Sequence, residues 1–171
     1  KTGEILPDSA LKELEKTDAI YLGAVGHPKV ETGIIERELL LKLRFYFDEY
    51  VNLRPVKLYP GVNTPLKDKE PKDINLYVVR ENTEDFYVGV GERFNRNHYS
   101  TKLNLSRRLY DIKFNLDVNV DRYEEVAFQI GVITKSCSER VIEYAFKLCR
   151  KKGFKKITSV DKANVLTSMY G

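Results

Sequence analysis

The spacing of apolar residues predicts helices and strands that alternate along the first part of the chain. A helix is expected to begin at residues 6–9, with Ser9 or Asp8 as its cap, and a long amphipathic helix is expected at residues 33–50. Between them, residues 18–26 (DAIYLGAVG) indicate a buried strand that enters a Gly-rich loop. This order of helix, strand, loop and helix is typical of α/β proteins.

The middle of the chain is dominated by patterns typical of strands. A short strand is expected at residues 52–57, and residues 66–73 indicate a charged surface loop. Residues 74–80 (INLYVVR) are apolar on both faces and rich in β-branched side chains, which predicts a strand buried on both sides. Two alternating, charge-rich strands within residues 99–120 and a more apolar strand at 126–134 predict an antiparallel extension.

The last part of the chain predicts one long helix and one strand. The helix is expected at residues 136–152, with Ser136 or Ser138 as its cap and Gly153 as its end. A strand is expected at residues 155–160, and another helix is expected to begin close to the last residue.

The two cysteines fall in this predicted helix. Cys137 and Cys149 are twelve residues apart, which separates them by roughly 18 Å along a helix. They therefore cannot form a disulfide with each other. Neither belongs to a CxxC or Cys/His pattern, so we interpret them as packing or partly exposed side chains rather than metal ligands.

Composition indicates a globular protein. The chain has 171 residues, of which 42% are hydrophobic, enough for one domain or a domain and a half. There is no initial Met and no charged-then-apolar leader, and no apolar run approaches the roughly 20 residues of a membrane helix. We expect an internal piece of a soluble, cytoplasmic protein with no membrane partner.

Charge leaves one alternative class open. The formal net charge is +4, from 29 basic and 25 acidic residues, which by itself does not imply a nucleic-acid partner. The densest basic stretch, residues 93–113, also carries Phe94, Tyr99 and Tyr110, so a non-catalytic carboxylate-binding or nucleic-acid-binding module is the alternative interpretation. The alternation of residues 98–103 favours a half-exposed strand with a solvated basic face.

Several common catalytic motifs are absent from the sequence. The loop GAVGHP lacks the full GxGxxG pattern, and there is no P-loop, GxSxG, HExxH or zinc spacing. The two histidines, His27 and His98, are not beside a serine or cysteine nucleophile, so a hydrolase triad is not indicated. His98 is expected on a surface strand and His27 in a loop.

Three arginines, a tyrosine and a lysine are the candidate functional residues. Arg44, Arg54 and Arg80 lie near predicted element ends, and arginine binds carboxylates bidentately, which favours a pocket for a di- or tricarboxylic acid. Tyr87 and Lys162 would add proton-transfer chemistry. Taken singly, four of them have a simpler interpretation: Arg44 would pair with an aspartate one turn later, Arg54 and Lys162 would be strand-end or surface charges, and Tyr87 would fill space in the core or on the surface. Arg80 is harder to explain in this way, because an unpaired guanidinium at the end of a buried strand is costly.

Five blocks of the sequence together resemble a known family. They are DAIYLGAVGHP, LLLKLRFYFDEYVNLRPVKLYPGV, DINLYVVRENTEDFYVGVG, ITKSCSERVIEYAF and TSVDKANVL, and the resemblance omits residues 95–125. They resemble the β-decarboxylating dehydrogenases of 3-isopropylmalate, D-malate and tartrate, isocitrate and homoisocitrate. The resemblance implies an α/β fold of the isocitrate/isopropylmalate dehydrogenase type. Residues 1–50 would belong to a first, cofactor-side domain and residues 51–171 to a second domain, which carries a strand arm at about 95–125.

The resemblance also implies roles for individual residues. Arg44, Arg54 and Arg80 match the arginines that clamp the carboxylates of the substrate. Tyr87 matches the tyrosine that protonates the enol carbon after decarboxylation. Lys162 matches the lysine that assists proton removal from the 2-hydroxyl group and acts across a dimer.

Cofactors and partners follow from the same resemblance. Asn164 matches an asparagine near the nicotinamide, and the expected cofactors are NAD, rather than NADP, with Mg²⁺ or Mn²⁺. The metal ligands are expected outside this chain. The expected partners are a small dicarboxylate and a second copy of the chain, in a homodimer or higher homo-oligomer, with no nucleic acid.

Two leucines bear on the choice of substrate. Leu40 and Leu41, one turn before Arg44, match the positions that face the variable side group of the substrate. Leucines suit an apolar group or none, which favours 3-isopropylmalate or D-malate and tartrate over isocitrate. The sequence departs from the family pattern at residues 30–38 and at Asp85, which stands where a glycine is common.

Overall fold

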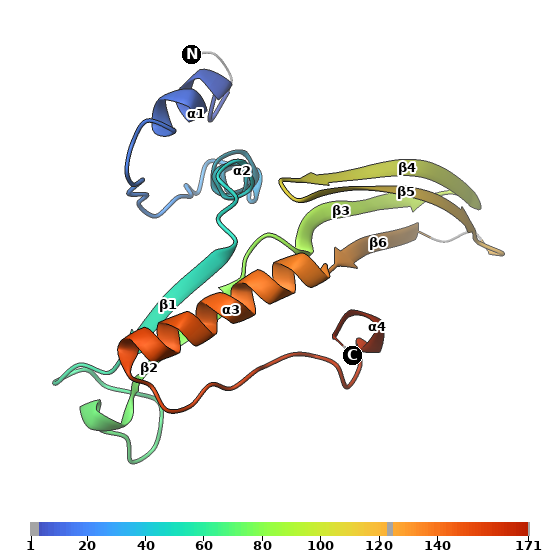
Figure 1. Ribbon diagram of the computed structural model, residues 1–171. Helices are drawn as coiled ribbons and strands as arrows, with labels where there is room; N and C mark the ends of the chain where they lie inside the picture. Colours follow the sequence, from blue (N-terminus) through green and yellow to red (C-terminus); the bar gives the residue numbers. More distant parts are fainter. Residues whose placement is uncertain (1–3, 123–124, 171) are drawn as a thin grey trace. The chain divides into compact units, whose positions relative to one another are not determined.

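The computed structural model describes residues 4–122 and 125–170 and divides into two compact units, Lys1–Glu49 and Tyr50–Gly171 (Figure 1). Residues 123 and 124, which belong to the predicted arm, lie outside the described residues, as do residues 1–3 and 171. Each unit is built from its own local contacts. The assignment of the two units to cofactor and substrate domains stays a prediction.

The first unit begins with a short helix, α1 (Asp8–Leu14). Its cap residue is Pro7, which holds the extended conformation of a cap and accepts backbone hydrogen bonds from Ala10 and Leu11. The predicted cap at Ser9 or Asp8 is therefore wrong, because both residues already lie inside the helix. The side chain of Leu11 is almost fully buried.

The predicted strand at residues 18–26 is absent from the structure. The segment is largely exposed, and the side chain of Tyr21 is fully exposed. An extended segment becomes a strand only when a neighbour pairs with its backbone, and no strand within residues 4–122 or 125–170 does so. The apolar pattern identified an extended segment but not its partner.

The predicted helix at residues 33–50 is shorter than expected. A π-helical segment, η1 (Glu36–Leu41), continues into α2 (Lys42–Tyr46). Two residues with positive φ limit the helical segment: Gly33, at φ +90°, precedes it, and Asp48, at φ +50°, follows it. Neither conformation can belong to a right-handed helix.

In the second unit, β1 (Val51–Lys57) pairs antiparallel with β2 (Asn75–Glu81), and a loop containing a 3₁₀ turn, η2 (Pro71–Asp73), leads into β2. The predicted positions of both strands are confirmed. The prediction that the second strand is buried on both faces is wrong, since Leu76 and Val78 are 46% and 44% exposed. Because this ladder has two strands, a large part of its surface stays exposed.

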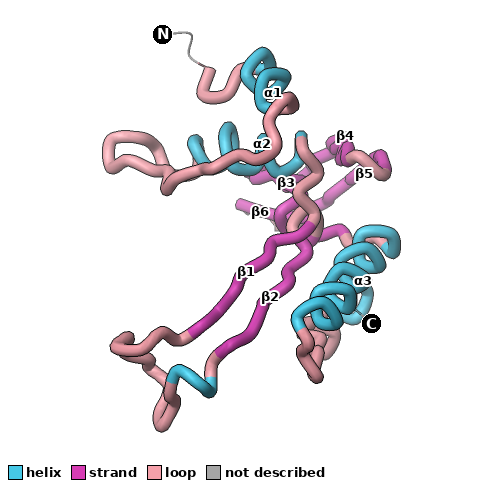
Figure 2. The backbone as a smooth tube through the Cα atoms, turned by 60° about the vertical axis from the view of Figure 1, so that its left-hand side comes forward, coloured by secondary structure: helices cyan, strands magenta, loops and turns pink. Residues whose placement is uncertain are grey.

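The antiparallel extension is confirmed and contains one more strand than the sequence predicted. The predicted pair is the hairpin of β4 (His98–Arg107) and β5 (Tyr110–Asn119). The third predicted strand is β6 (Glu125–Val132), and its partner is β3 (Asp85–Asn95), which sequence analysis missed. In Figures 1 and 2 the hairpin lies beside the β3–β6 ladder, and the buried side chains of β3 and β4 form a small core between them: Val88, Val90 and Leu105.

The long helix α3 (Lys135–Lys152) runs alongside β1 and β2 in both views (Figures 1 and 2). Its cap is Thr134, whose hydroxyl oxygen accepts a hydrogen bond from the backbone of Cys137, so the predicted serine caps are wrong. Gly153 ends the helix at φ +72°, as predicted. Both cysteines lie on α3 with free thiols, and burial raises the pKa of Cys137.

The chain after α3 is mostly irregular. Residues 155–160 are exposed and form no strand, so that prediction is wrong for the same reason as at residues 18–26: no neighbour pairs with the segment. A single helical turn, α4 (Thr167–Tyr170), follows. Within the described ranges, no helix is both long enough and apolar enough to cross a membrane.

Candidate functional site

Two of the predicted arginines lie on one face of the β1–β2 ladder. Asn52 is paired directly with Arg80 across the strands, so their side chains share a face. Arg54 follows Asn52 by two residues along β1 and therefore also points to that face. The antiparallel register thus brings together Arg54 and Arg80, which are far apart in the sequence.

Two asparagine side chains connect these arginines. The Nε of Arg54 donates to the Oδ1 of Asn52 at 2.8 Å, and the Nδ2 of Asn52 donates to the Oδ1 of Asn82 at 3.2 Å. The same Oδ1 of Asn82 accepts a bond from the Nη2 of Arg80 at 3.0 Å. Neither asparagine was predicted from the sequence. The signal was there, because Asn52 lies two residues from Arg54 and Asn82 lies two residues from Arg80, the spacing of side chains on one strand face.

Tyr87 lies beside Arg80, at the irregular start of β3. Asp85 pairs with Val132 and Val90 with Ile130, so the residues between Asp85 and Val90 bulge out of the ladder. Bulges of this kind re-aim side chains. The guanidinium carbon of Arg80 lies 5.1 Å from the centre of the Tyr87 ring, within cation–π range.

The turn between β2 and β3 is rigidly held. The carboxylate of Glu81 accepts hydrogen bonds from the backbone N–H and hydroxyl of Thr83 and from the backbone N–H of Glu84, at 2.7 to 2.9 Å. The backbone N–H of Asn82 donates to the carbonyl of Tyr50 at 3.2 Å. Asn82, Thr83 and Glu84 are all almost fully buried, which fixes the position of the Asn82 carboxamide next to Arg80.

Glu84 connects this turn to helix α3. Its carboxylate accepts hydrogen bonds from the backbone N–H of Thr134 at 2.8 Å and from the hydroxyl of Thr134 at 2.7 Å. A buried carboxylate at a helix N-terminus is stabilised by the helix dipole as well as by these bonds. Burial, with the nearby Glu84 carboxylate adding to it, raises the pKa of Tyr110. We interpret this group as structural support for the turn.

Asp85 has a backbone conformation that is unusual for a residue other than glycine. Its φ is +61°, the left-handed region that favours glycine. Its Oδ2 accepts a hydrogen bond of 2.7 Å from the hydroxyl of Tyr170 in α4. Burial and this carboxylate raise the pKa of Tyr170 to about 12. The contact attaches the end of the chain next to the segment that carries Tyr87.

Lys162 and Asn164 lie in the exposed segment before α4. The Oδ1 of Asp161 accepts from the backbone N–H of Ala163 at 2.9 Å, and the carbonyl of Lys162 accepts from Val165 and Leu166, which forms a tight turn. Within the described part of the chain, the Lys162 side chain makes no hydrogen bond with the asparagines or the tyrosine that surround the two arginines. The structure therefore does not bring the predicted lysine into the same cluster.

The remaining predicted residues belong to the first unit. Arg44 lies in α2, and Leu40 and Leu41 lie in η1 immediately before it; all three side chains are half-buried. The one-turn spacing of the leucines and Arg44 is as the sequence predicted. Their relation to Arg54 and Arg80 stays a prediction.

The described residues hold no cluster of side chains suited to a divalent metal. They contain no group of three or more His, Cys, Asp or Glu side chains arranged to hold a metal ion. The candidate residues are cations and amides, which are poor Mg²⁺ or Mn²⁺ ligand sets. Asn164 alone, exposed and in an irregular segment, does not define a nicotinamide site.

The exposed face of the β4–β5 hairpin carries charges of both signs. Its exposed charged side chains are balanced, with Lys102 and Lys113 near Asp111 and Asp117, rather than a basic stripe. The basic Arg107 is instead half-buried and donates to the backbone carbonyls of Thr83, Ser106 and Val88, and burial lowers its pKa.

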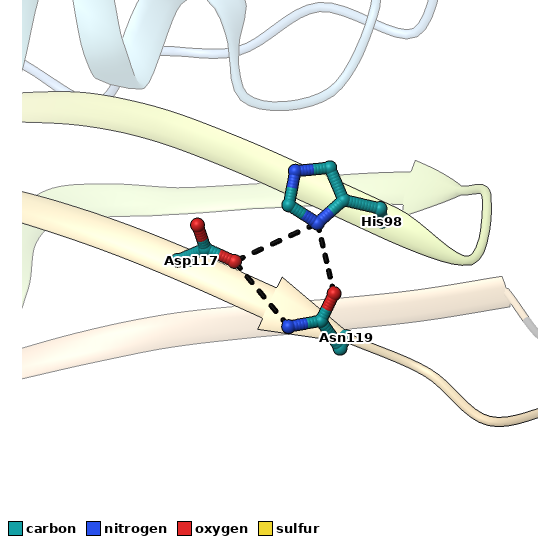
Figure 3. Close-up of polar contacts among 3 residues, drawn as sticks. All are labelled: His98, Asp117 and Asn119. Atoms are coloured by element: carbon teal, nitrogen blue, oxygen red, sulfur yellow. Dashed lines mark hydrogen bonds and ion pairs between the residues drawn. The ribbon is translucent and has the colours of Figure 1, made fainter.

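The predicted surface position of His98 is confirmed. Its Nδ1 lies 2.9 Å from the Oδ1 of Asn119 and 3.6 Å from the Oδ1 of Asp117, across the hairpin, and its side chain is exposed (Figure 3). These contacts are ordinary cross-strand polar pairs on a solvated face.

Comparison with known proteins decides the family. The sequence profile described as isocitrate/isopropylmalate dehydrogenase matches residues 1–170. The chain belongs to the isocitrate/isopropylmalate dehydrogenase family. This membership confirms the resemblance on which the site residues were assigned, and the mixed helix and antiparallel strand content agrees with the predicted α/β fold class.

Relatives within the isocitrate/isopropylmalate dehydrogenase family are similar over almost the whole chain. A 3-isopropylmalate dehydrogenase from Thermobifida fusca (strain YX) is 45% identical over 166 residues, which are 97% of this chain and 40% of that protein. A 3-isopropylmalate dehydrogenase from Bifidobacterium longum (strain DJO10A) is 43% identical over 168 residues, 98% of this chain and 41% of that protein. The chain thus spans about two fifths of the length of these relatives.

Proposed function

We propose that this chain is part of an enzyme that carries out NAD-dependent oxidative decarboxylation of a 2-hydroxy dicarboxylic acid. The observation that carries the proposal is the pair of guanidinium groups of Arg54 and Arg80 on one ladder face, with Tyr87 beside them, in a chain of the isocitrate/isopropylmalate dehydrogenase family. Because the chain spans about two fifths of its relatives, we infer that the remaining parts of the site belong to the intact enzyme.

The arginine pair suits a dicarboxylate. Each guanidinium presents a planar fork that matches a carboxylate. In the described residues, both terminal nitrogens of Arg54 and the Nη1 of Arg80 donate no hydrogen bond to the protein. We propose that these nitrogens bind the ligand, and two fixed cations on one face would orient two carboxylates of the same molecule. Arg44 is proposed to supply a third contact.

Proton transfers are assigned to Tyr87 and Lys162. Oxidation at C2 removes the proton of the 2-hydroxyl group, and we propose that Lys162, acting across a dimer, assists this step. Loss of carbon dioxide then leaves an enol, and we propose that the hydroxyl of Tyr87 gives a proton to its carbon. The position of Tyr87 over Arg80 supports this role, since the arginine would hold the substrate carboxylate next to the tyrosine.

Cofactors and assembly are part of the proposal. NAD, when bound, accepts the hydride from C2, and Asn164 is proposed to lie near its nicotinamide. Mg²⁺ or Mn²⁺ would be bound by residues elsewhere in the intact enzyme, in keeping with the cationic and amide character of this face. The enzyme is proposed to act in the cytoplasm as a homodimer or a higher homo-oligomer.

Among substrates, we propose 3-isopropylmalate first and D-malate or tartrate second. Leu40 and Leu41 are apolar, which suits an isopropyl group or no group and leaves a third carboxylate unpaired. The relatives named above are 3-isopropylmalate dehydrogenases, which favours the first choice.

Steady-state rates of the full-length protein with 3-isopropylmalate, D-malate, tartrate and isocitrate, each with NAD and a divalent metal, test the proposal. We expect kcat/KM for isopropylmalate to exceed that for isocitrate by at least about tenfold, the effect of one mismatched group in a pocket. Preference for isocitrate would overturn the role of the leucines. Absence of turnover with all four acids would overturn the proposed activity.

A further inference from the structure

We propose that Asn52 and Asn82 are positioning residues that orient the two arginines for a dicarboxylate without neutralising their charge. The inference rests on the proposed function, because it assigns to these amides a role in binding the same substrate. Neither residue was among the candidates from sequence analysis. Their role follows from three observations: the hydrogen bonds, the charge of the partners and the burial.

The hydrogen bonds form one continuous connection between the arginines. Asn52 accepts from Arg54 at 2.8 Å and donates to Asn82 at 3.2 Å, while Asn82 accepts from Arg80 at 3.0 Å. Each arginine is held by a single nitrogen, the Nε of Arg54 and the Nη2 of Arg80. The two terminal nitrogens of Arg54 and the Nη1 of Arg80 take no part in this connection.

The charge of the connecting groups is the second observation. A carboxylate in either position would bind a guanidinium more strongly than a carboxamide does, but it would cancel the positive charge that attracts the substrate. Asn52 lies opposite Arg80 in the ladder and two residues before Arg54, so an acid there would stand between both cations. The neutral amides keep two full positive charges close together.

Burial makes the connection rigid. Asn82 is 4% exposed and belongs to the turn that the Glu81 carboxylate holds through Thr83 and Glu84. Its carboxamide therefore cannot rotate freely. A fixed acceptor at this point limits the rotamers of Arg80, a side chain that would otherwise pay a large entropic cost on binding.

Two variants of Asn52 separate positioning from simple structural support. Asn52→Asp keeps the size and the acceptor for Arg54 but adds a negative charge, whereas Asn52→Ala removes the hydrogen bonds and leaves the charges. If the amide keeps the cations available, KM for the dicarboxylate rises by about tenfold or more in both variants, and more in Asn52→Asp, with kcat changed by less than about threefold. A merely structural role predicts the opposite order, with Asn52→Asp closer to wild type.

The matched control is Asn115→Asp, the same substitution at an exposed position of the β4–β5 hairpin, for which we expect an unchanged KM. The inference is overturned if Asn52→Asp has a KM equal to or lower than that of Asn52→Ala. The test uses Asn52 because it is half-buried, whereas Asn82 is almost fully buried. Substitutions at Asn52 are therefore expected to disturb folding less.

Calorimetric titration of the same proteins with D-malate distinguishes failure of this inference from failure of the proposed function. A wild-type protein that binds D-malate but turns over none of the acids contradicts the proposed activity, and the affinities of the two Asn52 variants then decide the inference. Affinity that falls in the order wild type, Asn52→Ala, Asn52→Asp supports it. A wild-type protein that binds no dicarboxylate overturns both.

Discussion

Asp85 shows at the scale of one residue how a backbone conformation restricts sequence. At φ +61° a side chain with a Cβ is strained, and Asp85 retains this conformation while its carboxylate accepts a hydrogen bond from Tyr170. The strain and the hydrogen bond act in opposite directions on stability. Two substitutions that both remove the carboxylate, and therefore the hydrogen bond, isolate the effect of the backbone strain.

We expect Asp85→Gly to be more stable than Asp85→Ala by about 1 kcal/mol, because only alanine keeps the strained Cβ. Both variants lose the Tyr170 hydrogen bond, so the comparison isolates the backbone. Urea unfolding of the full-length variants measures the difference. Equal stability, or a more stable alanine variant, would show that the position carries no strain.

The sequence predicted the candidate arginines but not the side chains that form hydrogen bonds with them. Arg54 and Arg80 were singled out because a guanidinium group binds a carboxylate bidentately, and the structure places both on one ladder face. The amides of Asn52 and Asn82 were missed because asparagine is common in turns and loops, where it needs no partner. Only the strand register shows that these asparagines lie next to the arginines.

At the scale of secondary-structure elements, the cap of α3 depends on a single threonine. The Thr134 hydroxyl oxygen accepts from the backbone of Cys137, and the hydroxyl donates to the buried carboxylate of Glu84. Thr134→Ala should therefore lower the free energy of unfolding by about 1 to 3 kcal/mol, which combines a lost cap with a weakened buried acceptor.

Thermal or urea unfolding of Thr134→Ala and of the matched control Ser138→Ala checks this expectation. Ser138 lies inside the first turn of α3, although the sequence predicted it as a possible cap. Its replacement should change stability by less than about 0.5 kcal/mol. The assignment of the cap would be contradicted if Ser138→Ala were the more destabilised variant.

The hairpin of adjacent strands was predicted correctly, whereas two segments with strand-like patterns and no pairing partner were predicted wrongly. The hairpin of β4 and β5 is local, so alternation alone identified it. Residues 18–26 and 155–160 have strand-like patterns, yet no strand of the described residues pairs with them. β3 was missed because the bulge after Asp85 and Gly89, at φ +73°, interrupt its alternation.

At the scale of the whole molecule, we propose that the chain carries the substrate-binding face and that other components of the site belong to the rest of the enzyme. The two arginines, their amides and Tyr87 belong to one connected group within the second unit. The described residues contain no set of metal ligands. The proposed activity therefore depends on the intact enzyme, which its relatives' greater length also favours.

The most direct test of the central claim, that Arg80 and its neighbours bind the dicarboxylate, is the kcat/KM of Arg80→Met in the full-length protein. Methionine keeps much of the length of the side chain and removes its charge. Losing a charge-assisted contact made in the transition state should lower kcat/KM for the preferred acid by about a hundredfold or more. Arg93→Met, which removes an exposed arginine paired with Glu125, should leave it unchanged. Wild-type kcat/KM in Arg80→Met would contradict the account.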